Sequence, residues 1–149
     1  MKGFNGLLIS EFQNVDGKLR WKLINELSYT FDIRLIDASL LDTFMLKEHY
    51  DIKDNEVTIT ALPGFLTDLG SVPRIIWWAI SPWDIARSAV IHDLLYADIR
   101  SSNLKTKKAA RKLADTVFQL AMKDSCPNVS QLHISGCYWA TRMFGAAAI

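Results

Sequence analysis

The first 65 residues of the chain place apolar side chains at alternating positions, which predicts β-strands. Between residues 21 and 31, polar residues separate the apolar positions Trp21, Leu23, Leu27, Tyr29 and Phe31. A two-residue period is typical of a half-buried antiparallel strand, because successive side chains point to opposite faces of the sheet. We therefore expect one strand over residues 21–31 and another over residues 57–61.

Two turn signals divide this strand-rich half. Asp16-Gly17 separates an apolar run at residues 7–12 from the strand at residues 21–31, which predicts a hairpin. Asp54-Asn55 is a second turn and leads into the next strand. Between them, residues 33–36 are expected to continue the sheet, and residues 37–50 fit either a short helix or a loop insertion.

After residue 64 the apolar period lengthens to three and four residues, as in amphipathic helices. Ser71, followed by Pro73, and Ser130 have the residue types that cap helix N-termini, and Gly145 is a stop signal. We expect about four helices, over residues 71–81, 84–96, 104–122 and 130–144.

These elements predict an α+β fold, in which a small antiparallel N-terminal sheet precedes a C-terminal cluster of helices. The chain has 149 residues, which is enough for one domain with its own core. We expect a single domain over residues 1–149, with a strand-rich part at 1–65 and a helical part at 66–149.

Composition excludes several classes of partner and site. Lys and Arg total 17 against 16 Asp and Glu, so no overall field attracts nucleic acid or anionic lipid. Cys126 and Cys137 are the two cysteines, too few for a disulfide framework or a four-ligand zinc site. The sequence shows no secretory signal and no apolar run long enough for a transmembrane segment. Reduced thiols in a cytoplasm are the simplest expectation.

Polar clusters interrupt the apolar pattern of the helical part. They are Thr67-Asp68 with Ser71, then His92-Asp93 with Tyr96, and then Arg111 with Asp115. Burying such groups costs free energy unless they pair with one another or bind a ligand. His92 and Tyr96 are four residues apart, as are Arg111 and Asp115, so each pair shares a helix face. We expect these side chains to converge between the helices.

Three interpretations of this convergence remain open. In the first, the polar side chains form a structural network that fixes the packing of the helices. In the second, Asp68, His92, Asp93 and Asp115 bind a divalent metal ion of unknown identity, which activates water. In the third, His92 is a general base oriented by a carboxylate, and Ser71 is a nucleophile or a substrate anchor.

The order and spacing of the motifs resemble the domain of unknown function 1353 family, found largely in bacteriophages and prophages. The motifs are Gly64–Arg74, Ala89–Tyr96, Ala114-Asp115 with Phe118, and Tyr138 with Arg142 ahead of Phe144-Gly145. The segment at residues 37–56 is longer than the usual hairpin of the family. The resemblance implies a phage origin and a shared role for Asp68, Ser71, His92, Asp93, Tyr96, Arg111 and Asp115, but no activity.

Our leading hypothesis is a phage protein of the late programme, acting in lysis, in the tail or in envelope penetration. It would be a small hydrolase, with Asp68, His92, Asp93 and Asp115 as metal ligands or acid–base groups. Ser71, Tyr96 and Arg111 would position or polarise the substrate. We expect it in the host cytoplasm, from which it could be assembled into the virion, with a phage structural protein or a host envelope component as partner.

The alternative hypothesis is a protein without enzymatic activity. It would be a virion or tail component, or an inhibitor that binds a host protein, and its polar cluster would be structural. The insertion at residues 37–56 and the apolar tail at residues 146–149 would then be contact surfaces, and the tail could support oligomerisation.

Overall fold

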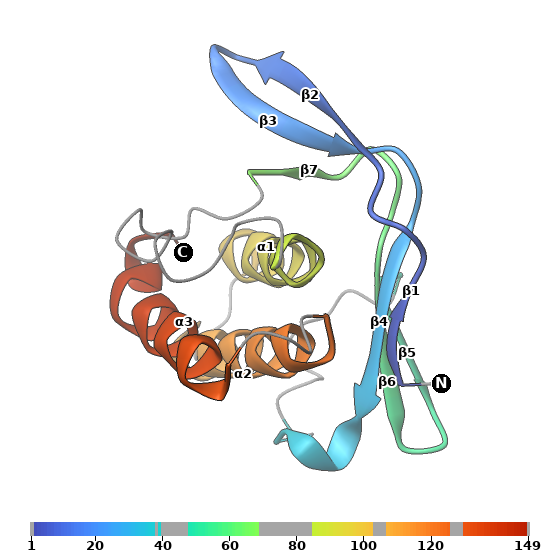
Figure 1. Cartoon of the computed structure of the whole chain (residues 1–149), viewed down its shortest axis with the longest axis vertical. Helices are drawn as coiled ribbons and strands as arrows, with labels where there is room; N and C mark the ends of the chain where they lie inside the picture. Colours follow the sequence, from blue (N-terminus) through green and yellow to red (C-terminus); the bar gives the residue numbers. More distant parts are fainter. Residues whose placement is uncertain are drawn as a thin grey trace.

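The structure is a computed structural model in which strands precede helices (Figure 1). The described residues are 2–37, 39, 48–68, 85–102, 107–125 and 130–148. Over this part of the chain the protein has the α+β architecture that the sequence predicts.

A four-stranded antiparallel sheet forms one side of the molecule (Figure 1). Its strands, in order of pairing, are β1 (Gly3–Asn5), β4 (Leu27–Asp32), β6 (Glu56–Ala61) and β5 (Tyr50–Lys53). In the central pair, Tyr29 lies opposite Ile59 and Phe31 lies opposite Val57, and all of these side chains are buried. The predicted strand at residues 57–61 is therefore confirmed, with its apolar positions on the core face.

A second sheet of three strands carries a hairpin that projects beyond the helices (Figure 1). Its strands are β2 (Ser10–Val15), β3 (Lys18–Leu23) and β7 (Leu66–Thr67). Asp16 and Gly17 form the turn with positive φ angles of 51° and 77°. Such angles suit a two-residue hairpin turn, so the predicted hairpin is confirmed.

The single strand predicted over residues 21–31 is wrong. β3 ends at Leu23, β4 begins at Leu27, and the two strands belong to different sheets. Leu23 and Leu27 are both fully buried in the same core. The apolar positions on the two sides of the break share one register, but Ile24 and Asn25 reverse the alternation where the chain changes sheets.

Residues 33–36 do not continue the sheet as expected. Ile33–Leu35 form a 3₁₀ turn, η1, because the Asp32 carboxylate accepts the backbone N–H of Arg34 at 3.0 Å and caps the turn. The segment at residues 37–50, which the sequence left ambiguous, contains the start of β5 at Tyr50. The rest of it lies mostly outside the described residues.

The described C-terminal part contains three α-helices, whereas the sequence pattern predicts about four. They are α1 (Ala86–Ser101), α2 (Lys107–Ser125) and α3 (Gln131–Phe144). The helix expected over residues 71–81, with its cap Ser71, lies outside the described residues, as does Asp84, the first residue of the second expected helix. None of the described helices has the length and apolar character needed to cross a membrane.

The predicted boundaries of the last helix are confirmed. The Ser130 hydroxyl accepts the N–H of His133 at 3.3 Å, so Ser130 is the N-cap of α3. Gly145 ends the helix and begins a 3₁₀ turn, η4 (Gly145–Ala148).

The elements form layers (Figure 1). α1 and α2 pack against each other and against the four-stranded sheet, and α3 packs on α2. One hydrophobic cluster joins buried residues of β3, β4 and β6 to buried residues of α1 and α2. α1 thus lies between the sheets and α2, and its polar side chains can reach either.

Candidate functional site

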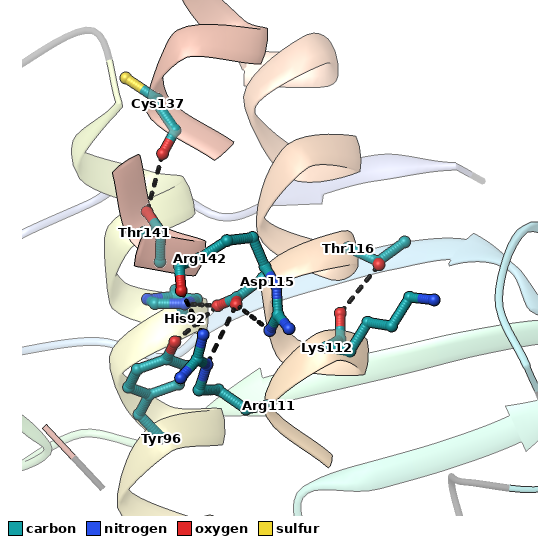
Figure 2. Close-up of polar contacts among 9 residues, drawn as sticks. All are labelled: His92, Tyr96, Arg111, Lys112, Asp115, Thr116, Cys137, Thr141 and Arg142. Atoms are coloured by element: carbon teal, nitrogen blue, oxygen red, sulfur yellow. Dashed lines mark hydrogen bonds and ion pairs between the residues drawn. The ribbon is translucent and has the colours of Figure 1, made fainter. Parts of the chain in front are cut away.

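Asp115, on α2, is the centre of a buried polar group contributed by three helices (Figure 2). Its side chain is fully buried. Its Oδ1 atom lies 2.9 Å from His92 Nε2 and accepts a hydrogen bond of 2.6 Å from the Tyr96 hydroxyl. Its Oδ2 atom accepts a hydrogen bond of 2.8 Å from Arg142 Nη1 on α3. Both carboxylate oxygens of Asp115 are thus occupied by protein donors.

Helical spacing explains why these groups meet. His92 and Tyr96 lie one turn apart on α1 and face α2 together. Their four-residue spacing in the sequence predicts this shared face. Small buried side chains on α2, including Ala110 and Ala114, allow α1 to approach closely. The ring of Phe118, one turn beyond Asp115, lies 4.6 Å from the His92 ring, and the Tyr96 ring lies 4.1 Å from it. Packing therefore fixes the imidazole on more than one side.

Arg111 adds a second guanidinium to the group. Its Nε atom lies 3.7 Å from Asp115 Oδ2, and its Nη2 atom donates to the backbone carbonyl of Arg142. The Nε atom is buried and has no hydrogen-bond acceptor in the described part of the chain. Two guanidinium groups and one carboxylate leave a net positive charge beside His92.

The neighbours of Asp115 determine its charge state. Burial raises the pKa of the Asp115 carboxyl, but hydrogen bonds from His92, Tyr96 and Arg142 outweigh burial and hold it below its usual range. Asp115 is therefore an anion at neutral pH. Burial and the hydrogen bond to Asp115 raise the pKa of the Tyr96 hydroxyl, so Tyr96 remains a proton donor.

Asp93 belongs to a second polar group, which lies beside β7. It accepts a hydrogen bond from the hydroxyl of Thr67, and its carboxyl is also hydrogen-bonded to that of Asp68. Burial, together with the charge of Asp68, raises the pKa of Asp93 to about 7. Two carboxyl groups in hydrogen-bond contact share a proton, because two adjacent anions repel each other.

The predicted site residues therefore separate into two groups. His92, Tyr96, Arg111 and Asp115 converge as expected, whereas Asp68 and Asp93 meet elsewhere. Among the described residues, no group of three or more His, Cys, Asp or Glu side chains is placed to hold a metal ion, so the predicted set of four ligands is not brought together. Ser71, the candidate nucleophile or anchor, lies outside the described residues.

Two residues that the sequence motifs include, but that were given no site role, take part in these groups. Arg142 binds Asp115 directly, and Thr67 binds Asp93. Arg142 had a signal in the sequence, because it is the charged residue that interrupts the apolar end of the chain. Phe118 belongs to the motif that begins at Ala114-Asp115, but its apolar pattern alone gives no sign that it packs on the His92 ring.

The Asp115 group has the arrangement of a general base and its orienting carboxylate. A carboxylate bound to one imidazole nitrogen fixes the tautomer and orientation of the ring, so that the other nitrogen can accept a proton. The Asp68–Asp93 pair has a different capacity. Two adjacent carboxyl groups, one exposed and one half-buried, provide the oxygen ligands that Mg²⁺, Ca²⁺ and Mn²⁺ prefer.

Comparison with known proteins identifies one family. Residues 44–141 match a family model described as "Protein of unknown function (DUF1353)". The match covers about two thirds of the chain and includes both polar groups except Arg142, which lies one residue beyond its end. Comparisons with curated proteins and with solved structures find no match.

Proposed function

The chain belongs to the DUF1353 family, and we propose that it is a small hydrolase with His92 as general base. One observation carries the proposal: His92 Nε2 lies 2.9 Å from Asp115 Oδ1, in a group where Tyr96 and Arg142 also bind Asp115. A purely structural network needs no histidine in this position, because an amide could donate the same hydrogen bond.

The charge state of Asp115 assigns the roles of the two imidazole nitrogens. As an anion, Asp115 can only accept hydrogen bonds. Nε2 of His92 therefore carries the ring proton and donates a hydrogen bond to Oδ1. Nδ1 then carries the lone pair that accepts a proton from water. The resulting hydroxide attacks the electrophilic atom of the substrate, and the imidazolium returns the proton to the leaving group.

Asp115, Tyr96 and Arg142 act through His92 in this proposal. The carboxylate stabilises the imidazolium that forms when water is deprotonated. The hydrogen bonds from Tyr96 and Arg142 hold Asp115 in place and keep it ionised. The positive charge of Arg111 and Arg142 beside the base favours a substrate that is anionic or becomes anionic in the transition state.

Asp68 and Asp93 are the residues that would hold a divalent cation. They fit such an ion because their carboxyl groups lie close together. Burial and the charge of Asp68 raise the pKa of Asp93 to about 7, and a bound cation would offset the repulsion between the two carboxylates. A bound cation would polarise the substrate and stabilise negative charge. Both carboxylate oxygens of Asp115 are already hydrogen-bonded. Asp115 and His92 therefore form the base in this proposal and are not ligands of the cation.

We place this activity in the late programme of a phage, in lysis, tail function or envelope penetration. The substrate would then be a component of the host envelope, such as a phospholipid ester or a bond of the cell wall. The family resemblance supports the phage setting, and the net positive charge at the site suits the anionic groups of these substrates.

The test is a hydrolysis assay with wild-type protein and matched variants. Substrates would include p-nitrophenyl esters, bis(p-nitrophenyl) phosphate, phosphatidylglycerol vesicles and purified peptidoglycan, each with and without Ca²⁺ or Mn²⁺. We expect His92→Gln to lower the rate by about 100- to 10,000-fold, and His133→Gln on α3 to retain it. No hydrolysis above background by the folded wild-type protein on any substrate would refute the proposal.

A specific observation supports the rival function of a virion component or a host-protein inhibitor. α3 exposes Leu132, Trp139 and Met143, which are 80%, 63% and 71% exposed, along one side of the helix. An exposed apolar surface of this kind is typical of a protein contact. Under this function, His92→Gln would lower the melting temperature but preserve phage infectivity, whereas Trp139→Ser would abolish a contact without unfolding the protein.

A further inference from the structure

Gly145 lies against the hydroxyl group of Tyr96, at the point where α3 ends. A Cβ atom built on Gly145 would lie 2.6 Å from the Tyr96 hydroxyl oxygen and 3.4 Å from two carbons of the same ring. The backbone of Gly145 is right-handed, with φ −67° and ψ −13°, which any residue adopts. The glycine is therefore explained by space and not by backbone conformation.

Tyr96 has little freedom to move away from an added side chain. Its hydroxyl donates a hydrogen bond of 2.6 Å to Asp115, its ring lies 4.1 Å from the His92 ring, and the residue is 5% exposed. A methyl group at position 145 must therefore displace the Tyr96 hydroxyl or push the end of α3 outward. The end of α3 carries Arg142, so either movement disturbs a donor to Asp115.

We propose that Gly145 is a positioning residue for the His92–Asp115 pair. By lacking a side chain, it leaves room for the Tyr96 hydroxyl to reach Asp115 while Arg142 binds the other oxygen. The effect on rate rests on the proposed hydrolase function. The effect on the Tyr96–Asp115 hydrogen bond rests on the geometry of the described residues alone.

The experiment compares Gly145→Ala with Gly136→Ala, a change within the same helix. A Cβ atom at Gly136 meets nothing within 4 Å. Gly136→Ala should raise the melting temperature, because alanine favours the helix and reduces the entropy of the unfolded chain. Gly145→Ala should lower it, and the hydrogen-bonded hydroxyl proton of Tyr96 should shift or disappear in the ¹H NMR spectrum. That resonance is assigned by its absence in Tyr96→Phe.

A double variant tests whether the hydroxyl is the source of the conflict. Tyr96→Phe removes the oxygen that the new methyl group would meet, leaving contacts at 3.4 Å. Adding Gly145→Ala to Tyr96→Phe should therefore lower the melting temperature less than adding it to the wild type. Equal losses in both backgrounds would overturn the proposal, as would a Gly145→Ala protein with an unchanged hydroxyl resonance.

Rate measurements separate this inference from the proposed function. If the protein is a hydrolase, Gly145→Ala should lower kcat by about 10- to 100-fold with little change in KM, because the substrate still binds. If no hydrolysis is found but the hydroxyl resonance and the double variant behave as expected, the role of Gly145 in positioning Tyr96 is supported and the hydrolase function is refuted. An active protein whose kcat is unchanged by Gly145→Ala would overturn the positioning role.

Discussion

His92 and Asp93 are neighbours in the sequence, yet their side chains belong to different polar groups. His92 binds Asp115 of α2, whereas Asp93 binds Thr67 of β7. Successive residues of an α-helix point roughly 100° apart, so α1 serves both groups from adjacent positions. The His-Asp dipeptide is thus a junction between the helical core and the edge of the second sheet.

The charge of Asp115 should be important for stability. Asp115→Asn leaves Arg111 and Arg142 beside a neutral group. The NH₂ group of the new amide, which is a hydrogen-bond donor, must then face one of the donors that now bind the carboxylate. Removing one partner of a buried ion pair typically costs about 3 kcal/mol or more. Urea unfolding of Asp115→Asn should show a loss of this size, and Lys112→Gln, an exposed change on the same helix, should stay within about 0.5 kcal/mol. Equal stability of both variants would contradict the central role of Asp115.

Asp98 should make the protein less stable as pH rises. Burial, with a contribution from nearby Glu48, raises the pKa of Asp98 to about 7 from its usual 3.8. The folded state then binds this proton more tightly than the unfolded state. The stabilisation is fully present below pH 3.8 and is lost as pH rises through 7.

Asp98→Asn should remove this part of the pH dependence, because its side chain cannot ionise. The free energy of unfolding at pH 8 should increase relative to the wild type, while the two proteins should approach each other below pH 4. Asp51→Asn, an exposed change on strand β5, is the control. It should leave the difference in the free energy of unfolding between pH 8 and pH 4 as it is in the wild type. A wild-type pH profile retained in full by Asp98→Asn would show that this carboxyl is not responsible.

Asp68 and Asp93 should bind a divalent cation more strongly as pH rises. Burial and the charge of Asp68 raise the pKa of Asp93 to about 7, and a cation competes with the proton that Asp93 binds below this pH. Cation binding should therefore strengthen between pH 5 and pH 8. Ligand binding to the folded state raises the melting temperature. In Ca²⁺ or Mn²⁺ we expect a rise of several degrees at pH 8 and a much smaller one at pH 5.

Variants distinguish this cation site from a site that includes His92. Asp93→Asn should abolish the rise in melting temperature, and His92→Gln should retain it. The opposite result, with the rise lost in His92→Gln and kept in Asp93→Asn, would show that the cation binds at His92 and Asp115.

Ser130 should stabilise the start of α3. Its hydroxyl accepts the backbone N–H of His133, so Ser130→Ala leaves that N–H without its cap. We expect a loss of about 1 kcal/mol in the free energy of unfolding, measured by urea denaturation. Ser130→Asp, which also caps and whose negative charge suits a helix N-terminus, should preserve or increase stability. A loss as large as that of Ser130→Ala would argue against the cap.

The sequence predicted those parts of the fold that depend on local interactions. The turns at Asp16-Gly17 and Asp54-Asn55 form where small or polar residues tolerate positive φ. Ser130 and Gly145 bound the last helix as expected. The pairing of His92 with Tyr96 on one face followed from their spacing, since a helix has a fixed period.

Other features depended on contacts between segments distant in the sequence. The break between β3 and β4 was not predicted, because Leu23 and Leu27 lie in one register of the period and face the same core. The interruption at Ile24 and Asn25 was the local sign of the break. η1 forms where a strand was expected, because the Asp32 carboxylate caps the turn. This local hydrogen bond outweighs the β propensity of Ile33 and Ile36.

The sequence by itself determined the α+β order of the elements, the caps and turns, and the set of polar residues from which a site can be built. Only the tertiary structure decided how that set divides, with Asp115 bound to His92, Tyr96 and Arg142, and Asp93 bound to Thr67 and Asp68. The physical reason is that helical spacing fixes the direction of each side chain around its own axis. Which partner it meets depends on how the helices and the sheet pack against one another.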